Sequence, residues 1–488
     1  MDNVIYAFGF FYGIGDKIKY FERLDGHLKR HGYRLVLVDE GDTVPETACE
    51  AAACPPFIAR GQRILGDTFF SNDDLTPDLL YAGTLDAELR QKPLAAEVLR
   101  SLLFISFVRE MFKKTPPALC LLWHQFNGRH HALAAFCQER SIPFLFMEYG
   151  SMPGTIAFDL EGQMAESRVT RESEAFSRLP VDETDREVAR QMVEMAFRGK
   201  KTRKPQASSV DVPAIAASFK AQGRKVIFYA GQNDWASGIL PQAWPDAKIH
   251  SPLYADTLDA LGHLSVLAER NNWQILFKPH PLVQDRHRDY TVDYPDRISL
   301  VVGANMFECI ECADVCATIL SQAAYHFLIH DKACVLLGRN QLSGKGCVYE
   351  PSGKGDVERC FQDALKKGFA PEQRERFLTH VAQLCRYYLF ALDDEAAAVM
   401  GRDADLAAER LTGVVRNGLR ADGFPFHEDI IQGPAWKRLR GPSNNRLRSF
   451  LLTPLKKIRP FVERAAKQLP RPVYVFLQKS YHRILHRL

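Results

Sequence analysis

The chain is 488 residues long, several times the size of a typical domain, so we expect two domains with an appendage. Its hydrophobic (46%), aromatic (11%) and charged (25%) fractions exclude a mainly disordered, collagen-like or coiled-coil protein, and its net charge is only +4. No stretch approaches about 18 consecutive apolar residues, and no basic segment with a cleavage site opens the chain, so we expect neither a membrane-spanning nor a secreted protein.

The first part of the chain, residues 1–198, alternates strand-like and helix-like segments. Short apolar runs predict strands at residues 4–10, 34–41, 117–124 and 142–150. Amphipathic or helix-forming patterns predict helices at 17–32, through most of 60–115, at 127–141 and at 182–198. This alternation indicates a parallel sheet covered by helices, a Rossmann-like domain.

A basic, Pro- and Ser-containing segment at 199–211 is typical of a linker, and a second α/β domain is expected at 212–354. Apolar runs predict its strands at 225–231, 273–281, 297–303, 314–321 and 333–338. Residues 355–435 are expected to close the body as helices. Two α/β domains joined by a linker fit the GT-B plan, in which ligands lie between the domains at the carboxyl ends of the strands.

The most specific segment of the second domain is Lys278-Pro279-His280-Pro281, directly after an apolar strand. Both prolines restrict the backbone, so the segment is expected to leave the sheet rigidly and to aim its cation and imidazole into the cleft. That pair suits the phosphate of a nucleotide donor. The alternative is a structural histidine beside a solvated lysine.

Other strand ends of this domain supply further candidates for donor binding. Ser321 and Gln322 stand where a strand meets a helix, so Ser321 is an N-cap and also a candidate phosphate contact. Gln232 follows the first strand of the domain, and Lys345 lies in a glycine-rich loop after the last.

In the first domain, Glu148 emerges at the end of an apolar strand, before Gly150. Partial burial there would suit a general base, and a salt-bridged structural glutamate is the alternative. Asp39 and Glu40 are a second candidate for the general base, although the same residues are typical of an ordinary turn.

Acceptor-side contacts are expected between a strand and its following helix, and in the loop beyond Glu148. Asn127 and Arg129 occupy the first position, and Asp159 the second.

Metal and dinucleotide sites are not expected. Cys309, Cys312 and Cys316 have a spacing that could supply three metal ligands, but the surrounding sequence reads as a helix that leads into a strand, with no suitable fourth ligand. The eleven cysteines are too few for a disulfide scaffold and indicate a reducing, cytoplasmic compartment. The early Gly13 and Gly15 lack the third glycine of a dinucleotide fingerprint.

Taken together, these segments resemble bacterial capsule polysaccharide biosynthesis proteins, the group that includes Kdo transferases and is related to sialyl- and polysialyltransferases. The resemblance covers roughly residues 118–350 and rests on the segments GQND, SPLYAD, FKPHP, ATILSQAA, SGKGCVYE and EYGSMPGTIAFDLEGQ. It implies a GT-B enzyme that uses a nucleotide-activated sugar, with a CMP-linked acidic sugar as the expected donor. We expect no cofactor and no metal. Lys278 and His280 would match the family's phosphate contact, Ser321 with Gln322 its serine motif, and Glu148 its catalytic acidic motif.

The end of the chain differs electrostatically from the rest. Residues 436–488 carry 14 Lys or Arg and one acid, a charge of +13, whereas residues 1–435 carry −9. Cations alternate there with Phe, Leu, Ile, Trp and Tyr in short segments that prolines interrupt. We expect these segments to form interfacial helices on an anionic membrane. A nucleic-acid site is less favoured, because the acidic rest of the chain offers no further basic surface for nucleic acid. A disordered, solvent-exposed tail is the remaining alternative.

The sequence therefore predicts a GT-B glycosyltransferase bound peripherally to the inner face of the plasma membrane, which transfers a sugar onto a glycan or glycolipid of a surface polysaccharide. Three alternatives stay open: a glycerophosphate-type transferase of the teichoic-acid kind, a nucleotide-sugar epimerase, and a non-catalytic scaffold of a polysaccharide assembly complex.

Overall fold

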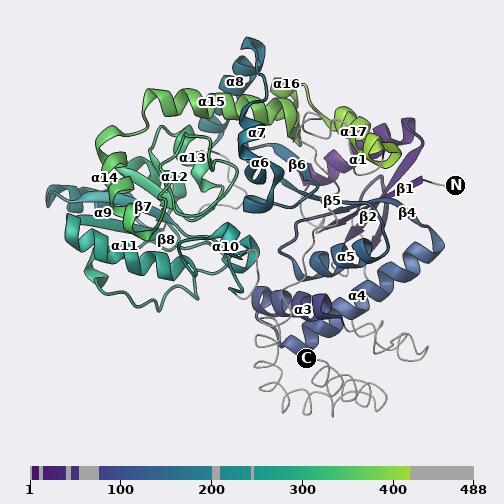
Figure 1. The fold of residues 1–488 in the computed structure, drawn as a ribbon, viewed down its shortest axis with the longest axis horizontal. Coiled ribbons are helices and arrows are strands. Elements are labelled where there is room, and N and C mark those ends of the chain that lie inside the picture. The colour runs from purple at the N-terminus through teal and green to yellow at the C-terminus, as the bar shows by residue number, and fades with distance from the viewer. Residues whose placement is uncertain are drawn as a thin grey trace.

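The computed structural model describes residues 3–9, 15–39, 46–53, 76–200, 209–242 and 247–417. They form two α/β domains that lie side by side, each around its own sheet (Figure 1). None of the helices within these ranges is both long and apolar enough to cross a bilayer. The basic tail at 436–488 and most of the predicted linker lie outside the described residues.

The first sheet has seven strands in the spatial order β12-β6-β5-β4-β1-β2-β3. In chain order they are β1 (Asn3–Gly9), β2 (Tyr33–Asp39), β3 (Glu50–Ala53), β4 (Pro117–Leu122), β5 (Phe144–Tyr149), β6 (Thr155–Asp159) and β12 (Leu389–Ala391). The strands from β5 to β3 are parallel, whereas β6 runs antiparallel to β5 and to β12. Alternate residues of β1 point to opposite faces, so Ile5 and Ala7 enter one core while Val4, Tyr6 and Phe8 enter the other.

Each face of this sheet is covered by helices. One face packs against α1 (Gly15–Arg30) and α17 (Ala404–Asn417). The other packs against α3 (Pro77–Arg90), α4 (Leu94–Lys114) and α5 (Gly128–Glu139). The predicted doubly covered sheet is therefore present.

The second sheet is parallel throughout, with the spatial order β11-β10-β7-β8-β9. Its strands are β7 (Lys225–Ala230), β8 (Trp273–Lys278), β9 (Ile298–Leu300), β10 (Val315–Thr318) and β11 (Cys334–Leu336). One face packs on α9 (Val212–Ala221), α12 (Met306–Cys312) and α13 (Ala323–Ile329), and the other on α11 (Thr257–Asn271) and α14 (Val357–Lys367). The two-domain α/β fold class and the five strands predicted here are confirmed.

The chain crosses between the domains twice, which differs from the predicted boundaries. Helix α8 (Glu183–Gly199), expected in the first domain, shares the hydrophobic core of the second and contacts α13 and α15 (Pro371–Tyr387). After α15 the chain returns through β12, α16 (Asp394–Met400) and α17, and α17 packs on α1. The predicted closing helices at 355–435 therefore include a strand of the first sheet.

Candidate active site

A cavity of about 550 Å³ lies between the two domains, at the carboxyl ends of strands from both sheets. Six of the residues predicted from the sequence line it: Glu148, Gln232, Lys278, His280, Ser321 and Gln322. The volume falls within the usual range for small-molecule sites. The strand-end prediction thus brings one carboxylate of the first domain and several polar groups of the second to the same space.

Lys278 ends strand β8, where it pairs with Ala230 of β7. Its side chain is half-buried, and burial lowers the pKa of Lys278 from its ordinary value. Among the described residues, Lys278 has no ion-pair partner. A half-buried cation without a counterion is costly, so this position favours an anionic ligand.

His280 follows at the rim of the same wall. Its Nδ1 accepts a hydrogen bond from the backbone N–H of Leu282, at 3.2 Å. The neutral ring therefore carries its proton on Nε2, which is a donor. Lys278 and His280 thus offer an ammonium and an N–H group within one short segment.

Ser321 and Gln322 precede the seven-residue helix α13. The Ser321 hydroxyl accepts from the backbone N–H of Ala323, at 3.2 Å, while Gln322 occupies the N-cap position without a side-chain cap. The predicted helix start is confirmed, one residue later than expected. Both side chains are partly exposed to the cavity.

Gln232 lines the cavity but is mostly engaged inside the second domain. Its Nε2 donates to Asp234 Oδ1 and to Thr257 Oγ1, at 2.8 and 2.6 Å. Asp234 also accepts from the backbone of Thr257, and burial raises the pKa of Asp234 to about 6. Gln232 is therefore tied into a network that holds the loop after β7.

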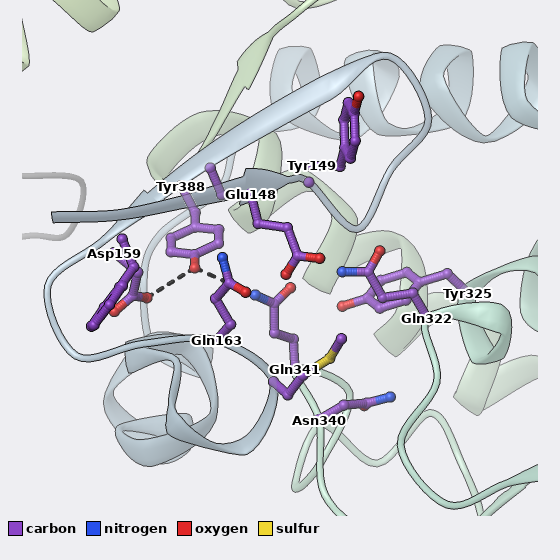
Figure 2. A pocket seen from close by; sticks show the side chains of 13 residues that line it. Glu148, Tyr149, Asp159, Gln163, Gln322, Tyr325, Asn340, Gln341 and Tyr388 are labelled. Carbon is purple, nitrogen blue, oxygen red and sulfur yellow. Dashed lines mark hydrogen bonds between the residues drawn. The ribbon is translucent and has the colours of Figure 1, made fainter. Parts of the chain in front are cut away.

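Glu148 lies on β5, opposite Ala157 of β6, and its side chain is half-buried. Figure 2 shows its carboxylate pointing away from the strand, toward Gln322 and Gln341 of the second domain. The acidic group predicted as a base therefore stands at the junction of the two domains. Its rival is only partly described: Asp39 is buried, and Glu40 lies outside the described residues.

A lysine and a histidine of the first domain also line the cavity and were not predicted. Lys17 extends from α1, with its ammonium 3.2 Å from the centre of the Trp123 ring, and that ring meets Tyr149 edge to face. His124 lies two residues after β4, with a φ of 76°. The strand-end criterion could have found His124, whereas Lys17 lies in the first turn of a helix whose orientation the sequence does not give.

Asn127 and Arg129, predicted as acceptor contacts, support the first domain instead. Asn127 caps α5 by accepting from the backbone N–H of Arg129, at 3.0 Å. The Arg129 guanidinium is buried 3.6 Å from the carboxylate of Asp86. This correction has a simple cause: a polar residue between strand and helix is used first for capping.

Lys345, predicted as a donor contact, also turns away from the cavity. Its ammonium donates to the carbonyls of Val169 and Ser173 and to the Ser173 hydroxyl, at 3.0, 3.1 and 2.6 Å. Burial lowers the pKa of Lys345 to about 7. The glycine-rich loop therefore fastens residues 168–177 to the second domain.

Asp159 does not line the cavity between the domains, which corrects its prediction as an acceptor contact, and Figure 2 shows its carboxylate beside the Tyr388 hydroxyl. Asp159 is 2% exposed and accepts hydrogen bonds from the backbone of Glu161 and Arg168 and from the Tyr388 hydroxyl. Burial raises the pKa of Asp159 to about 6.

The three spaced cysteines belong mainly to the core of the second domain. Cys309 and Cys316 are buried, and burial raises the pKa of Cys309 to about 12, which opposes the thiolate that a metal needs. Over the described ranges, no group of three or more His, Cys, Asp or Glu side chains could hold a metal ion.

Comparisons with known proteins add solved structures of similar arrangement. No family model and no curated protein matches the chain. Similar structures include two Kdo transferases of Thermosulfurimonas dismutans KpsC: the β-Kdo 2,7 transferase is 19% identical over 63% of this chain and 88% of that one, with a TM-score of 0.36, and the β-Kdo 2,4 transferase is 15% identical over 55% and 79%, with a TM-score of 0.38.

A UDP-GlcNAc 2-epimerase of Methanocaldococcus jannaschii is also similar, at 9% identity over 78% of this chain and 99% of that one, with a TM-score of 0.36. Kdo transferases belong to the group that the sequence motifs resemble.

Proposed function

We propose that the chain is a glycosyltransferase that moves a sugar from a nucleotide donor onto a glycan or glycolipid acceptor. The observation that carries this proposal is the cavity in which Glu148 of one domain meets Lys278 and His280 of the other. A carboxylate can take the proton of an acceptor hydroxyl. The ammonium of Lys278 and the N–H of His280 can hold a departing phosphate by charge and by hydrogen bonds.

In the proposed reaction, Glu148 accepts the acceptor's hydroxyl proton while that oxygen bonds to the anomeric carbon of the donor sugar. The bond between the anomeric carbon and the phosphate oxygen breaks, and the nucleotide leaves with the electron pair. Lys278 and His280 stabilise its charge, and Ser321 and Gln322 are further donor contacts. No metal or cofactor takes part in this proposal, and closing the domains would orient both substrates.

The resemblance of the motifs to Kdo transferases favours a CMP-linked acidic sugar as donor and a surface polysaccharide, or its lipid-linked precursor, as acceptor. A lipid-linked acceptor would place the enzyme at the cytoplasmic face of the membrane. The basic residues of 436–488 suit that location, since each Lys or Arg near an anionic surface contributes about 1 kcal/mol.

The donor class is tested by the thermal stability of the purified chain with CMP, CDP, UDP or GDP, beside His280→Ala. We expect CMP to raise the melting temperature and the variant to lose that rise. A rise with UDP or GDP would discard the CMP-linked donor while keeping a nucleotide-sugar enzyme. The absence of any response, with normal polymer made in cells by a Glu148→Gln, His280→Ala double variant, would favour the scaffold.

The membrane proposal is tested by sedimentation of the full chain with vesicles of phosphatidylglycerol or of phosphatidylcholine alone. We expect salt-sensitive binding to the anionic vesicles and much weaker binding after Lys456, Lys457 and Arg459 are all replaced by Glu. Equal binding by the charge-reversed chain would contradict it. Reversing Lys354, Lys366 and Lys367 in the second domain gives the matched control.

A further inference from the structure

A small, partly enclosed chamber lies beside Glu148 and adjoins the cavity between the domains, since Glu148 and Gln322 line both. It is lined by Glu148, Asp159, Gln163, Gln341 and Tyr388, among others, and Figure 2 shows these side chains converging. Its volume of about 20 Å³ holds one water molecule and is far too small for a sugar.

Two amide oxygens in this chamber have no hydrogen-bond partner among the described residues. Gln163 is 5% exposed; its Nε2 donates to the Met147 carbonyl at 3.0 Å, and its Oε1 is buried without a donor. The Nε2 of Gln341 donates to the Tyr388 hydroxyl at 3.4 Å, and its Oε1 is likewise buried without a donor. Since buried polar atoms are normally paired, the two oxygens favour a small ligand with two donors, and water has two.

Beyond the amides, the chain of contacts ends at a buried carboxylate. The hydroxyl of Tyr388 donates to Asp159 Oδ2 at 2.8 Å. Burial raises the pKa of Tyr388, and the charges of Asp159 and Glu148 add to that rise. The hydrogen bonds thus run in one direction, from Gln341 through Tyr388 to Asp159.

We propose that one water molecule occupies the chamber and completes a hydrogen-bonded chain from Glu148 to Asp159, in which Asp159 and Tyr388 are positioning residues that strengthen Glu148 as a base. The proposal rests on the proposed function, because it takes Glu148 as the group that accepts a proton.

Each hydrogen bond of the chain is satisfied when Glu148 is protonated. Its new O–H donates to the water, the water donates to the oxygens of Gln163 and Gln341, and Gln341 and Tyr388 continue the chain to Asp159. The negative charge of Asp159 polarises the chain in the same sense. Both effects favour the protonated form of Glu148 and so raise its affinity for the acceptor's proton.

Several charged groups surround the two carboxylates and must stay constant in a test. Asp159 is faced by Arg168 and Tyr388. The cavity that Glu148 enters is also lined by Lys17, His124, Lys278, His280, His326 and Asp393. The variants below leave all of these except Tyr388 unchanged.

The test is the pH profile of kcat/KM for transfer, measured for the wild type, Tyr388→Phe and Asp159→Asn. Without the Asp159 charge, Glu148 should lose its proton at lower pH, so we expect the acid limb to move down by roughly one unit in Asp159→Asn. Removing the phenol raises the proton affinity of Asp159 and breaks the chain, so Tyr388→Phe should move the limb in the same direction. Tyr254→Phe, which removes a buried hydroxyl bonded to His263, should leave the limb in place.

An acid limb that stays in place in folded Tyr388→Phe would overturn the inference, and this variant keeps the buried ring if Asp159→Asn fails to fold. Full transfer by Glu148→Gln would instead overturn the base assignment of the proposed function. A high-resolution crystal structure gives a readout without turnover: a water bonded to Gln163 Oε1 is expected, and an empty chamber would overturn the inference.

Discussion

The two walls of the cavity present their charges in different ways. Glu148 lies within a strand that is paired on both sides, by β4 and β6, and buried polar groups stand beside it. Lys278 and His280 lie at and beyond a strand end, in a loop where Leu282 is 65% exposed. Proton transfer needs a hydrogen-bond distance, whereas the attraction between charges falls off slowly, so the sheet suits the base and the loop suits the phosphate.

The largest effect is expected on the first-domain wall. Glu148→Gln keeps the shape of the side chain but cannot take a proton, so we expect kcat for transfer to fall by about 10²- to 10⁴-fold. Stabilisation by the donor nucleotide should stay as in the wild type. Glu139→Gln, at an exposed helix end, serves as the control. If Glu148→Gln also lost stabilisation by the nucleotide, proton transfer and donor binding would not be assigned to separate walls of the cavity.

An intermediate effect is expected on the second-domain wall. Lys278→Met removes a cation that has no ion-pair partner in the described part of the chain, so donor affinity should fall by about 10- to 100-fold, the usual cost of a lost charged hydrogen bond. Calorimetric titration with the donor nucleotide measures it. Lys354→Met removes a cation that pairs with Asp259 at 3.2 Å, and it should bind normally. A fall in kcat with unchanged donor affinity would reverse the assignment.

The smallest effect on binding is expected from Lys345, a loop cation of the same domain that faces inward. Lys345→Met removes the buried hydrogen bonds from its ammonium to the carbonyls of Val169 and Ser173, so the free energy of unfolding should fall by about 1–3 kcal/mol while nucleotide affinity stays unchanged. Urea unfolding and nucleotide titration measure the two quantities. Weaker nucleotide binding in a stably folded variant would restore Lys345 to the site.

The site residues that the sequence predicts correctly are those whose position is set by neighbouring residues along the chain. Lys278 and His280 follow a long apolar strand and alternate with prolines, so both the strand end and the direction of the loop are set nearby. Glu148 is predicted for the same reason. Asn127 shows the limit of this reasoning, because the same strand-end position is used there to cap a helix.

The parts that the sequence does not predict depend on contacts between distant segments. Tyr388 bonds to Asp159 across 229 positions, and β12 joins a sheet whose other strands end at Asp159. The short β6 reads as a turn because its neighbours Gly150, Pro153 and Gly154 dominate the local pattern. Hydrophobic periodicity carries no information about such pairings, so the chamber beside Glu148 emerges only from the structure.

The return of the chain through β12 to α17 determines where the remaining residues begin. Helix α17 packs on α1, so the described part of the chain ends at Asn417 in the domain that carries Glu148. If the basic segment holds the enzyme at a lipid surface, as proposed above, its attachment to the body is through the domain proposed to bind the acceptor. An acceptor confined to two dimensions would then meet its binding site at a raised effective concentration, while the donor arrives by free diffusion from solution.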